Sequence, residues 1–148
     1  MELTIPVTAK EYESAGSKFI TFPANAKVGD VQYRDVEVGQ VDWDTPGQSI
    51  KFPVTVTEAG ADEGKKDKIS CGVKPEAVWK LKEILRELGV EVKIVNGKPK
   101  FETDELTGMA VVGVWTMQEG YKGGDETAEK VRYPKLTALV KSKPETII

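Results

Sequence analysis

Residues 74–89 read KPEAVWKLKEILRELG and predict the helix around which the rest of the chain is organised. Pro75 suits a first helical position, because the N–H that proline lacks has no partner within the helix there. Glu76 would place its negative charge near the positive end of the helix dipole. Gly89 suits the left-handed residue that often closes a helix. We therefore expect a helix over residues 75–88. Its buried stripe would consist of apolar residues three and four positions apart: Ala77, Val78, Leu81, Ile84, Leu85 and Leu88.

The composition narrows the class of protein. The chain has 148 residues, enough for one domain with a substantial core. Its formal net charge of −3 excludes a globally basic nucleic-acid binder but allows a local basic face. The single cysteine, Cys71, excludes an internal disulfide, and the absence of histidine argues against a zinc site. No apolar run reaches the roughly 20 residues that span a bilayer. Without signal-peptide features at its start, the chain is expected to be soluble and intracellular, with no membrane partner.

Residues 1–30 are predicted to form an N-terminal arm. Leu3, Ile5 and Val7 alternate with polar residues and proline, as in a short strand at a sheet edge. The arm could pack on its own barrel, or it could dock on a neighbouring subunit. Both alternatives stay open from the sequence alone.

From residue 31 onward the pattern is that of strands separated by turns. Val36 and Val38 share one face of the first strand, whereas Val41 and Trp43 share the other face after Gly39. A glycine at such a change of phase is typical of a bulge or sharp bend. We therefore predict one long, bent strand. Further strands are predicted over residues 50–57, 66–73, 109–117 and 130–140.

The connections between these strands carry their own signals. Residues 58–64 are acidic and rich in glycine, so we expect a mobile hairpin loop there. Asn96-Gly97 between β-prone residues predicts an accessory hairpin over residues 91–101. Residues 103–108 suggest a single capped turn, and residues 118–129 a long polar loop.

In chain order the pattern gives three strands, one helix and two strands. This order, with a bent first strand, is that of the OB-fold, a five-stranded Greek-key barrel. The strand count and the helix position follow from the pattern, whereas closure of the barrel is an analogy. We expect a mainly β fold in which an OB-fold-like barrel over residues 31–140 carries the helix between strands three and four. A loose tail would follow over residues 141–148.

The chain also resembles a family of small phage and prophage proteins that are similar to single-stranded DNA-binding proteins. The resemblance covers roughly residues 31–140, and its motifs are a helix signature and a glycine-containing loop. It rests on Pro75 to Leu85, on Phe101, on Glu105-Leu106-Thr107-Gly108 before an apolar strand, and on Tyr121-Lys122-Gly123. It implies a role in phage DNA replication or recombination, in the cytoplasm of a bacterial host cell, with phage or host recombination proteins as partners. The chain lacks the long acidic, aromatic-ended tail through which bacterial single-strand binders recruit host repair proteins.

Binding of single strands without sequence preference needs cations that follow phosphates and flat rings on which bases stack. On an OB-fold this surface is the outer face of strands two and three with two neighbouring loops. Cations and rings converge on this expected face despite the acidic total, and contacts to several phosphates would make binding dependent on salt. The candidate nucleic-acid-binding residues are Trp43, Lys51, Lys66, Lys68, Trp115, Tyr121, Lys122, Arg132 and Tyr133.

Several candidates also have a purely structural interpretation. Lys66 and Lys68 could be the solvated face of a strand, and Trp43 could belong to the core. Trp115 lies in a strand whose two rows are both apolar, so either row could face inward. Tyr121 stands in a polar loop, where no core requires an aromatic ring.

Trp79 lies on the polar side of the predicted helix. An indole in that position usually covers something: the accessory hairpin, the N-terminal arm or another subunit. We therefore take Trp79 as a candidate partner or subunit contact, and we consider a homo-oligomer because single-strand binders often multiply a weak site in this way.

An enzyme is not expected. Without histidine, and with one cysteine on a strand, the usual general bases and nucleophile pairs are absent. Carboxylates such as Asp42 and Asp44 are more typical of solubilising charge than of a metal site, so we expect neither a metal nor a cofactor. The expected function is non-sequence-specific binding of single-stranded DNA, with RNA left open. The alternative is a protein–protein interaction module on the same barrel, such as a virion component or a recombinase accessory factor.

Overall fold

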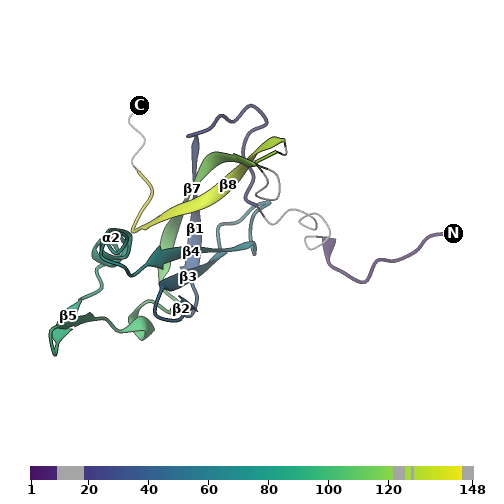
Figure 1. The fold of residues 1–148 in the computed structure, drawn as a ribbon. Coiled ribbons are helices and arrows are strands. Elements are labelled where there is room, and N and C mark those ends of the chain that lie inside the picture. The colour runs from purple at the N-terminus through teal and green to yellow at the C-terminus, as the bar shows by residue number, and fades with distance from the viewer. Residues whose placement is uncertain (10–18, 122–125, 128, 145–148) are drawn as a thin grey trace.

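The computed structural model describes residues 1–9, 19–121, 126–127 and 129–144. They form an antiparallel sheet, a separate two-stranded hairpin and an α-helix (Figure 1). The expectation of a mainly β fold with a helix is confirmed. In chain order the elements are β1 (Val31–Val38), β2 (Asp42–Thr45), β3 (Ser49–Val56), β4 (Lys66–Gly72), α2 (Trp79–Glu87), β5 (Lys93–Val95), β6 (Lys98–Lys100), the 3-10 turn η1 (Thr103–Glu105), β7 (Ala110–Tyr121) and β8 (Lys130–Val140).

The main sheet has the strand order β2-β3-β1-β7-β8, with β4 paired to β3. Each of these pairs is antiparallel. Strands β4 and β8 contact each other, and α2 packs against both of them. Within the described residues no hydrogen-bonded ladder joins β4 to β8, so the sheet is open. The closed barrel expected from the sequence is therefore not confirmed.

The bend predicted at Gly39 is present. Strand β1 pairs with the second half of β3, and β2 pairs with its first half. Between them the N–H of Gly39 donates a hydrogen bond to the carbonyl oxygen of Pro53 at 2.8 Å. A Cβ added at Gly39 would lie 3.2 Å from Cγ of Pro53, which explains why a residue without a side chain suits this close approach. Val38 and Val41, on either side of the bend, are both buried.

The core lies between the inner face of the sheet and α2. Every second residue of β3 and β4 points inward, as the alternation predicted. The buried core residues that the sheet and α2 contribute are Val36, Val38, Phe52, Val54, Val56, Ile69, Cys71, Leu81, Ile84, Leu85, Val111, Trp115, Leu136 and Leu139. Burial raises the pKa of the Cys71 thiol to about 11. Because the thiolate is the reactive form, Cys71 is an inert core residue.

The helix is shorter than the sequence predicted. It begins at Trp79, whereas residues 75–78 form turns in which the N–H of Ala77 bonds to the carbonyl oxygen of Lys74 at 2.9 Å. No side chain caps the first turn, and Glu76 lies outside it, so its predicted dipole interaction is absent. Gly89 has a φ of 74°, the left-handed conformation predicted for the helix end.

Strand β7 is longer than the sequence predicted. It continues to Tyr121, through residues 118–121 that we expected in a loop. The reason is that β8 extends the ladder as far as the pair Tyr121 and Lys130, which satisfies the backbone groups of this polar stretch.

The connection between β3 and β4, expected to be a mobile loop, is anchored by Asp62. The Asp62 side chain is buried and accepts hydrogen bonds from the N–H and hydroxyl of Thr21, from Arg34 at 3.2 Å and from Lys65 at 2.9 Å. Burial alone would raise the pKa of this carboxyl, but the bonds from Lys65 and Thr21 lower it to about 2. Together with the buried Ile20, this anchor holds the chain from residue 19 onward against its own sheet.

None of the helices in the described part of the chain combines the length and the apolar character needed to cross a membrane.

Candidate nucleic-acid interface

Three of the predicted lysines share the outer face of β3 and β4. Lys51 lies directly opposite Ser70, and Lys68 lies opposite Pro53. Lys66 pairs with Thr55 two positions further along the same face. Because residues directly opposite each other point to the same side of a sheet, the three ammonium groups face away from the core. We call these three residues the lysine face.

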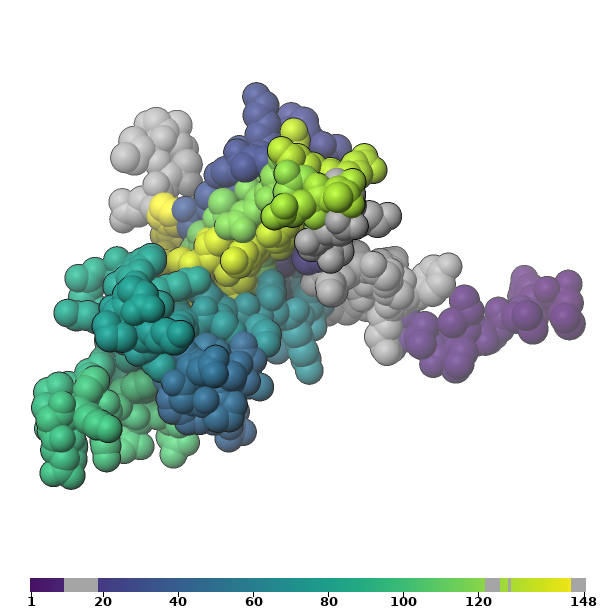
Figure 2. Space-filling model, in the orientation of Figure 1, coloured from purple at the N-terminus to yellow at the C-terminus, as the bar shows by residue number. Residues whose placement is uncertain are grey.

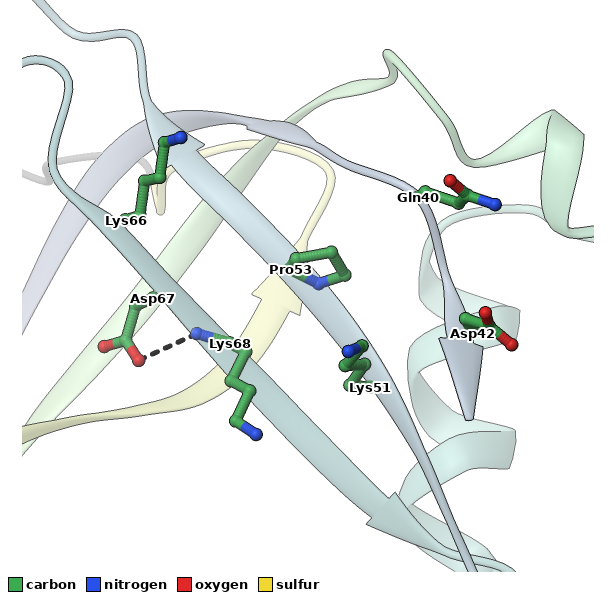
Figure 3. A pocket seen from close by; sticks show the side chains of 7 residues that line it. All are labelled: Gln40, Asp42, Lys51, Pro53, Lys66, Asp67 and Lys68. Carbon is green, nitrogen blue, oxygen red and sulfur yellow. Dashed lines mark hydrogen bonds between the residues drawn. The ribbon is translucent and has the colours of Figure 1, made fainter. Parts of the chain in front are cut away.

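The lysine face borders a shallow depression of about 540 Å³. Figure 3 shows Lys51, Pro53 and Lys68 side by side across the two strands, with Gln40 and Asp42 on the side of the bend. The outer face of Pro53 gives the floor an apolar element. A shallow, open surface of this kind suits an extended polymer better than a small molecule, which typically binds in a deep, mostly apolar cavity.

Acidic side chains also stand on this surface. Nζ of Lys68 donates a hydrogen bond to Oδ1 of Asp44 at 2.9 Å, and the hydroxyl of Ser70 donates to Oδ2. The bonds from Ser70 and Lys68 lower the pKa of Asp44, so its charge opposes that of Lys68 at neutral pH. Asp42 lies directly opposite Lys51 in the ladder. The surface therefore carries mixed charge rather than the purely basic row that the sequence suggested.

Two lysines of the lysine face are available to bind a phosphate. Lys51 and Lys66 form no ion pair with another described residue. The pair between Lys68 and Asp44 is solvent-exposed, and such pairs contribute little to stability. A phosphate can therefore compete with Asp44 for Lys68 at little cost.

Trp43 is not brought to the lysine face. It pairs with Ile50, which belongs to the inward row of β3 and packs against the core. Its indole is 44% exposed, because β2 pairs with β3 on one side and has no described strand on its other side. Trp43 is thus a partly exposed residue on the opposite side of the sheet from the three lysines.

The prediction that Trp115 stacks on bases is wrong. Its side chain is 1% exposed, and its ring lies in the core beside Leu136. A Cβ added at Gly113 would lie 2.5 Å from the Trp115 ring, so the glycine two residues earlier makes room for the indole. The ring N–H is satisfied by Asp67, whose Oδ2 lies 2.9 Å from Nε1. The row of β7 that contains Val111 and Trp115 is therefore the inward one.

Other candidate nucleic-acid-binding residues lie where β7 ends and β8 begins. Tyr121 is 40% exposed, and Nζ of Lys130 lies 5.7 Å from the centre of its ring, within the range of a cation–π contact. Lys130 also lies 3.6 Å from Glu119. Lys122, predicted beside this ring, lies outside the described residues. Tyr121 is thus an exposed ring with a cation beside it.

Arg132 and Tyr133 have structural contacts. Arg132 donates a hydrogen bond to the carbonyl oxygen of Ala26 at 3.1 Å, which ties β8 to the segment before β1. Tyr133 is half-buried and covers Gly120, where an added Cβ would lie 3.1 Å from its ring. Both residues therefore stabilise the fold locally, and Arg132 keeps an exposed side chain.

Trp79 is 58% exposed and borders a groove of about 300 Å³ between α2 and β8. Leu139 and Ile84 contribute the apolar part of this groove. No described segment of the chain covers the indole, so the intramolecular covers considered from the sequence are not seen there.

Two hydrogen-bond partners of these side chains were not predicted from the sequence: Asp44, which binds Lys68, and Asp67, which binds Trp115. Asp44 was considered only as loop charge, although its alternation with Trp43 places it on the outer side of β2, within reach of β4. Asp67 has no local signal, because its bond to Trp115 joins residues 48 positions apart. The described residues contain no group of three or more cysteine or carboxylate side chains that could hold a metal ion.

Comparisons of the chain with protein-family models, with curated proteins and with solved structures find no match. The inference of function therefore rests on the geometry given above.

Proposed function

We propose that the chain binds single-stranded DNA without sequence preference and is not an enzyme, with the sugar–phosphate backbone following the outer face of β3 and β4. The observation that carries the proposal is the lysine face: Lys51, Lys66 and Lys68 lie together on a shallow, open surface, and the first two are unpaired among the described residues. Phosphate contacts supply most of the affinity in non-specific binding, and an extended strand fits a surface without a deep cavity.

The strand connections support an OB-like barrel as the scaffold. Strands β1 and β2 act as one bent strand along β3, and β4 and β8 form the two ends of the sheet with α2 between them. The OB-fold is a partly open barrel that binds oligonucleotides on the face of its second and third strands. In this chain those strands correspond to β3 and β4, which carry the lysine face.

Base stacking is assigned to Tyr121. Its ring is exposed where β7 ends, and in chain order the connection from β7 to β8 corresponds to one of the two oligonucleotide-binding loops of an OB-fold. The resemblance noted in the sequence supports a role in phage-type replication or recombination inside a bacterial cell, with RNA as an alternative ligand.

The direct test is fluorescence anisotropy with labelled oligo-dT, compared with a duplex of equal length. We expect binding of the single strand that weakens as salt is added, and weaker binding of the duplex. Equal binding of both, or no binding at low salt, would contradict the proposal.

A second candidate function is a protein–protein interaction module, and exposed apolar side chains favour it. Leu3 is 80% and Ile5 is 55% exposed in residues 1–9, and Trp79 stands uncovered beside its groove. Figure 1 shows residues 1–9 apart from the sheet. These side chains fit a second copy of the chain, so the test is the molecular mass in solution by sedimentation velocity: a concentration-dependent dimer supports this function, and a monomer at every concentration contradicts it.

A further inference from the structure

The hairpin of β5 and β6 stands out from the rest of the molecule. In Figure 2 it forms the protruding green lobe at the lower left, and every residue from 91 to 100 is exposed. Asn96 and Gly97 have φ values of 54° and 76°, so both turn residues are left-handed, as in the tight two-residue turn of a regular hairpin. The hairpin is therefore well defined in shape, although its side chains contribute nothing to the core.

The cations of this hairpin gather on one of its faces. Lys93 lies directly opposite Lys100, and Lys98 lies opposite Val95. Since facing residues share a side, and residues two apart on one strand do too, the three ammonium groups project from the same face. Like charges placed directly opposite each other destabilise a strand pair. This arrangement works against formation of the hairpin itself.

Among the described residues, no acidic side chain forms an ion pair on this face. The three lysines form no ion pair with another described residue. The nearest acids in the sequence, Glu91 and Glu102, lie outside the two strands. By contrast, the lysine face on β3 and β4 has Asp44 bonded to Lys68 and Asp42 opposite Lys51. The hairpin therefore presents the less neutralised group of three cations.

We propose that the β5–β6 hairpin is a second contact to the phosphates of the bound nucleic acid, made by Lys93, Lys98 and Lys100. This inference rests on the proposed function and extends it, because nucleic acid on the lysine face alone would leave the hairpin unused. A polyanion relieves the repulsion between Lys93 and Lys100, so the cost of placing them opposite each other is recovered on binding. Nucleic acid is favoured over a lipid surface because residues 93–100 include no tryptophan or phenylalanine, the residues typical of interfacial anchors, and Phe101 next to them packs against the core.

The experiment measures the slope of the logarithm of the binding constant for oligo-dT against the logarithm of the salt concentration. The test variant combines Lys93→Gln, Lys98→Gln and Lys100→Gln. The control variant removes the same charge elsewhere, through Lys82→Gln, Lys135→Gln and Lys141→Gln, all at exposed positions. Far-UV circular dichroism and the melting temperature confirm that both variants fold, which is expected because the hairpin buries no side chain.

Each phosphate contact to a single strand contributes about 0.7 to this slope, so the hairpin variant should lose about 2 from it, and the control variant should keep the wild-type slope. Equal slopes for the hairpin variant and the wild type would overturn this inference and leave the proposed function intact. Absence of any binding by the wild-type chain would overturn both. Sedimentation with phosphatidylserine vesicles that only the hairpin variant loses, with an unchanged slope for DNA, would assign the hairpin to a membrane and overturn the inference as well.

Discussion

The indole Nε1 of Trp115 donates a hydrogen bond to Oδ2 of Asp67 at 2.9 Å and so joins β7 to β4, two strands that are not neighbours in the sheet. The bond crosses the interior of the molecule. It holds one end of the open sheet against its middle. Asp67 also lines the depression beside the lysine face, where its Oδ1 accepts a hydrogen bond from the backbone N–H of Lys68 at 2.7 Å. The relationship thus bears on stability and on the charge of the candidate interface.

Replacement of this indole should destabilise the fold. Trp115→Phe removes the donor to Asp67 and leaves a void beside Leu136, so we expect the free energy of unfolding to fall by about 2–3 kcal/mol. Chemical denaturation at pH 7 measures this loss. The control is Trp43→Phe, at a partly exposed position, where a change within about 0.5 kcal/mol is expected. Equal effects at the two positions would show that Trp115 is not the buried indole.

Acid should weaken the anchor at Asp62. Its pKa is about 2 in the folded chain and near 3.8 when unfolded, so the anchor stabilises the fold fully above pH 4 and loses this contribution as the pH falls towards 2. The difference corresponds to about 2 kcal/mol. Asp62→Asn should lose this amount at pH 7 and show a smaller decline in stability between pH 4 and pH 2 than the wild type.

The control for this anchor is Glu129→Gln, at an exposed carboxylate. It should keep both the stability and the pH profile of the wild type. An Asp62→Asn protein with the same decline in acid as the wild type would mean that another carboxylate controls the transition.

Substitutions of Tyr121 and Trp43 distinguish a ring that stacks on a DNA base from a ring that is only exposed to solvent. Both rings are about equally exposed, but only Tyr121 stands at the end of the β7–β8 hairpin. Tyr121→Ala should weaken binding of oligo-dT by about 1–3 kcal/mol, the contribution of one stacked base. Trp43→Ala, on the opposite side of the sheet from the lysines, should leave the affinity unchanged. A larger loss of affinity for Trp43→Ala would mean that the bound DNA passes over the opposite side of β2 instead.

Substitution of Trp79 tests whether the chain associates with a second copy of itself. If a second copy covers the groove between α2 and β8, Trp79→Ala should shift the sedimentation coefficient of a concentrated sample towards that of the monomer. Lys82→Ala, on the same helix and exposed, should leave it unchanged. Equal association of the Trp79 variant and the wild type would exclude this residue from the contact.

Features set by neighbouring residues could be predicted from the sequence. The bend at Gly39 follows from a change of apolar phase over a few positions, and the hairpin turn at Asn96-Gly97 follows from residues that tolerate a positive φ. The lysines of β3 and β4 were placed on one face because alternation alone decides which side of a strand a residue occupies.

Features set by distant partners could not be predicted. Both rows of β7 are apolar, so the orientation of Trp115 depends on the space that Gly113 leaves and on Asp67, a residue of another strand. The pairing of Asp44 with Lys68 depends on the register of three strands. Whether the sheet closes depends on the pairing of β4 with β8, which are far apart in the chain and contact each other without a hydrogen-bonded ladder among the described residues.

The central claim is that the lysine face binds the phosphates of single-stranded DNA, and the salt dependence of oligo-dT binding by the double variant Lys51→Gln, Lys66→Gln tests it most directly. Both side chains point outward and form no ion pair among the described residues, so the variant should fold like the wild type. We expect the slope of log binding constant against log salt to fall by about 1.4, that is, two contacts of about 0.7 each. The double variant Lys82→Gln, Lys135→Gln should keep the wild-type slope. A lysine-face variant with the same slope and affinity as the wild type would contradict the account.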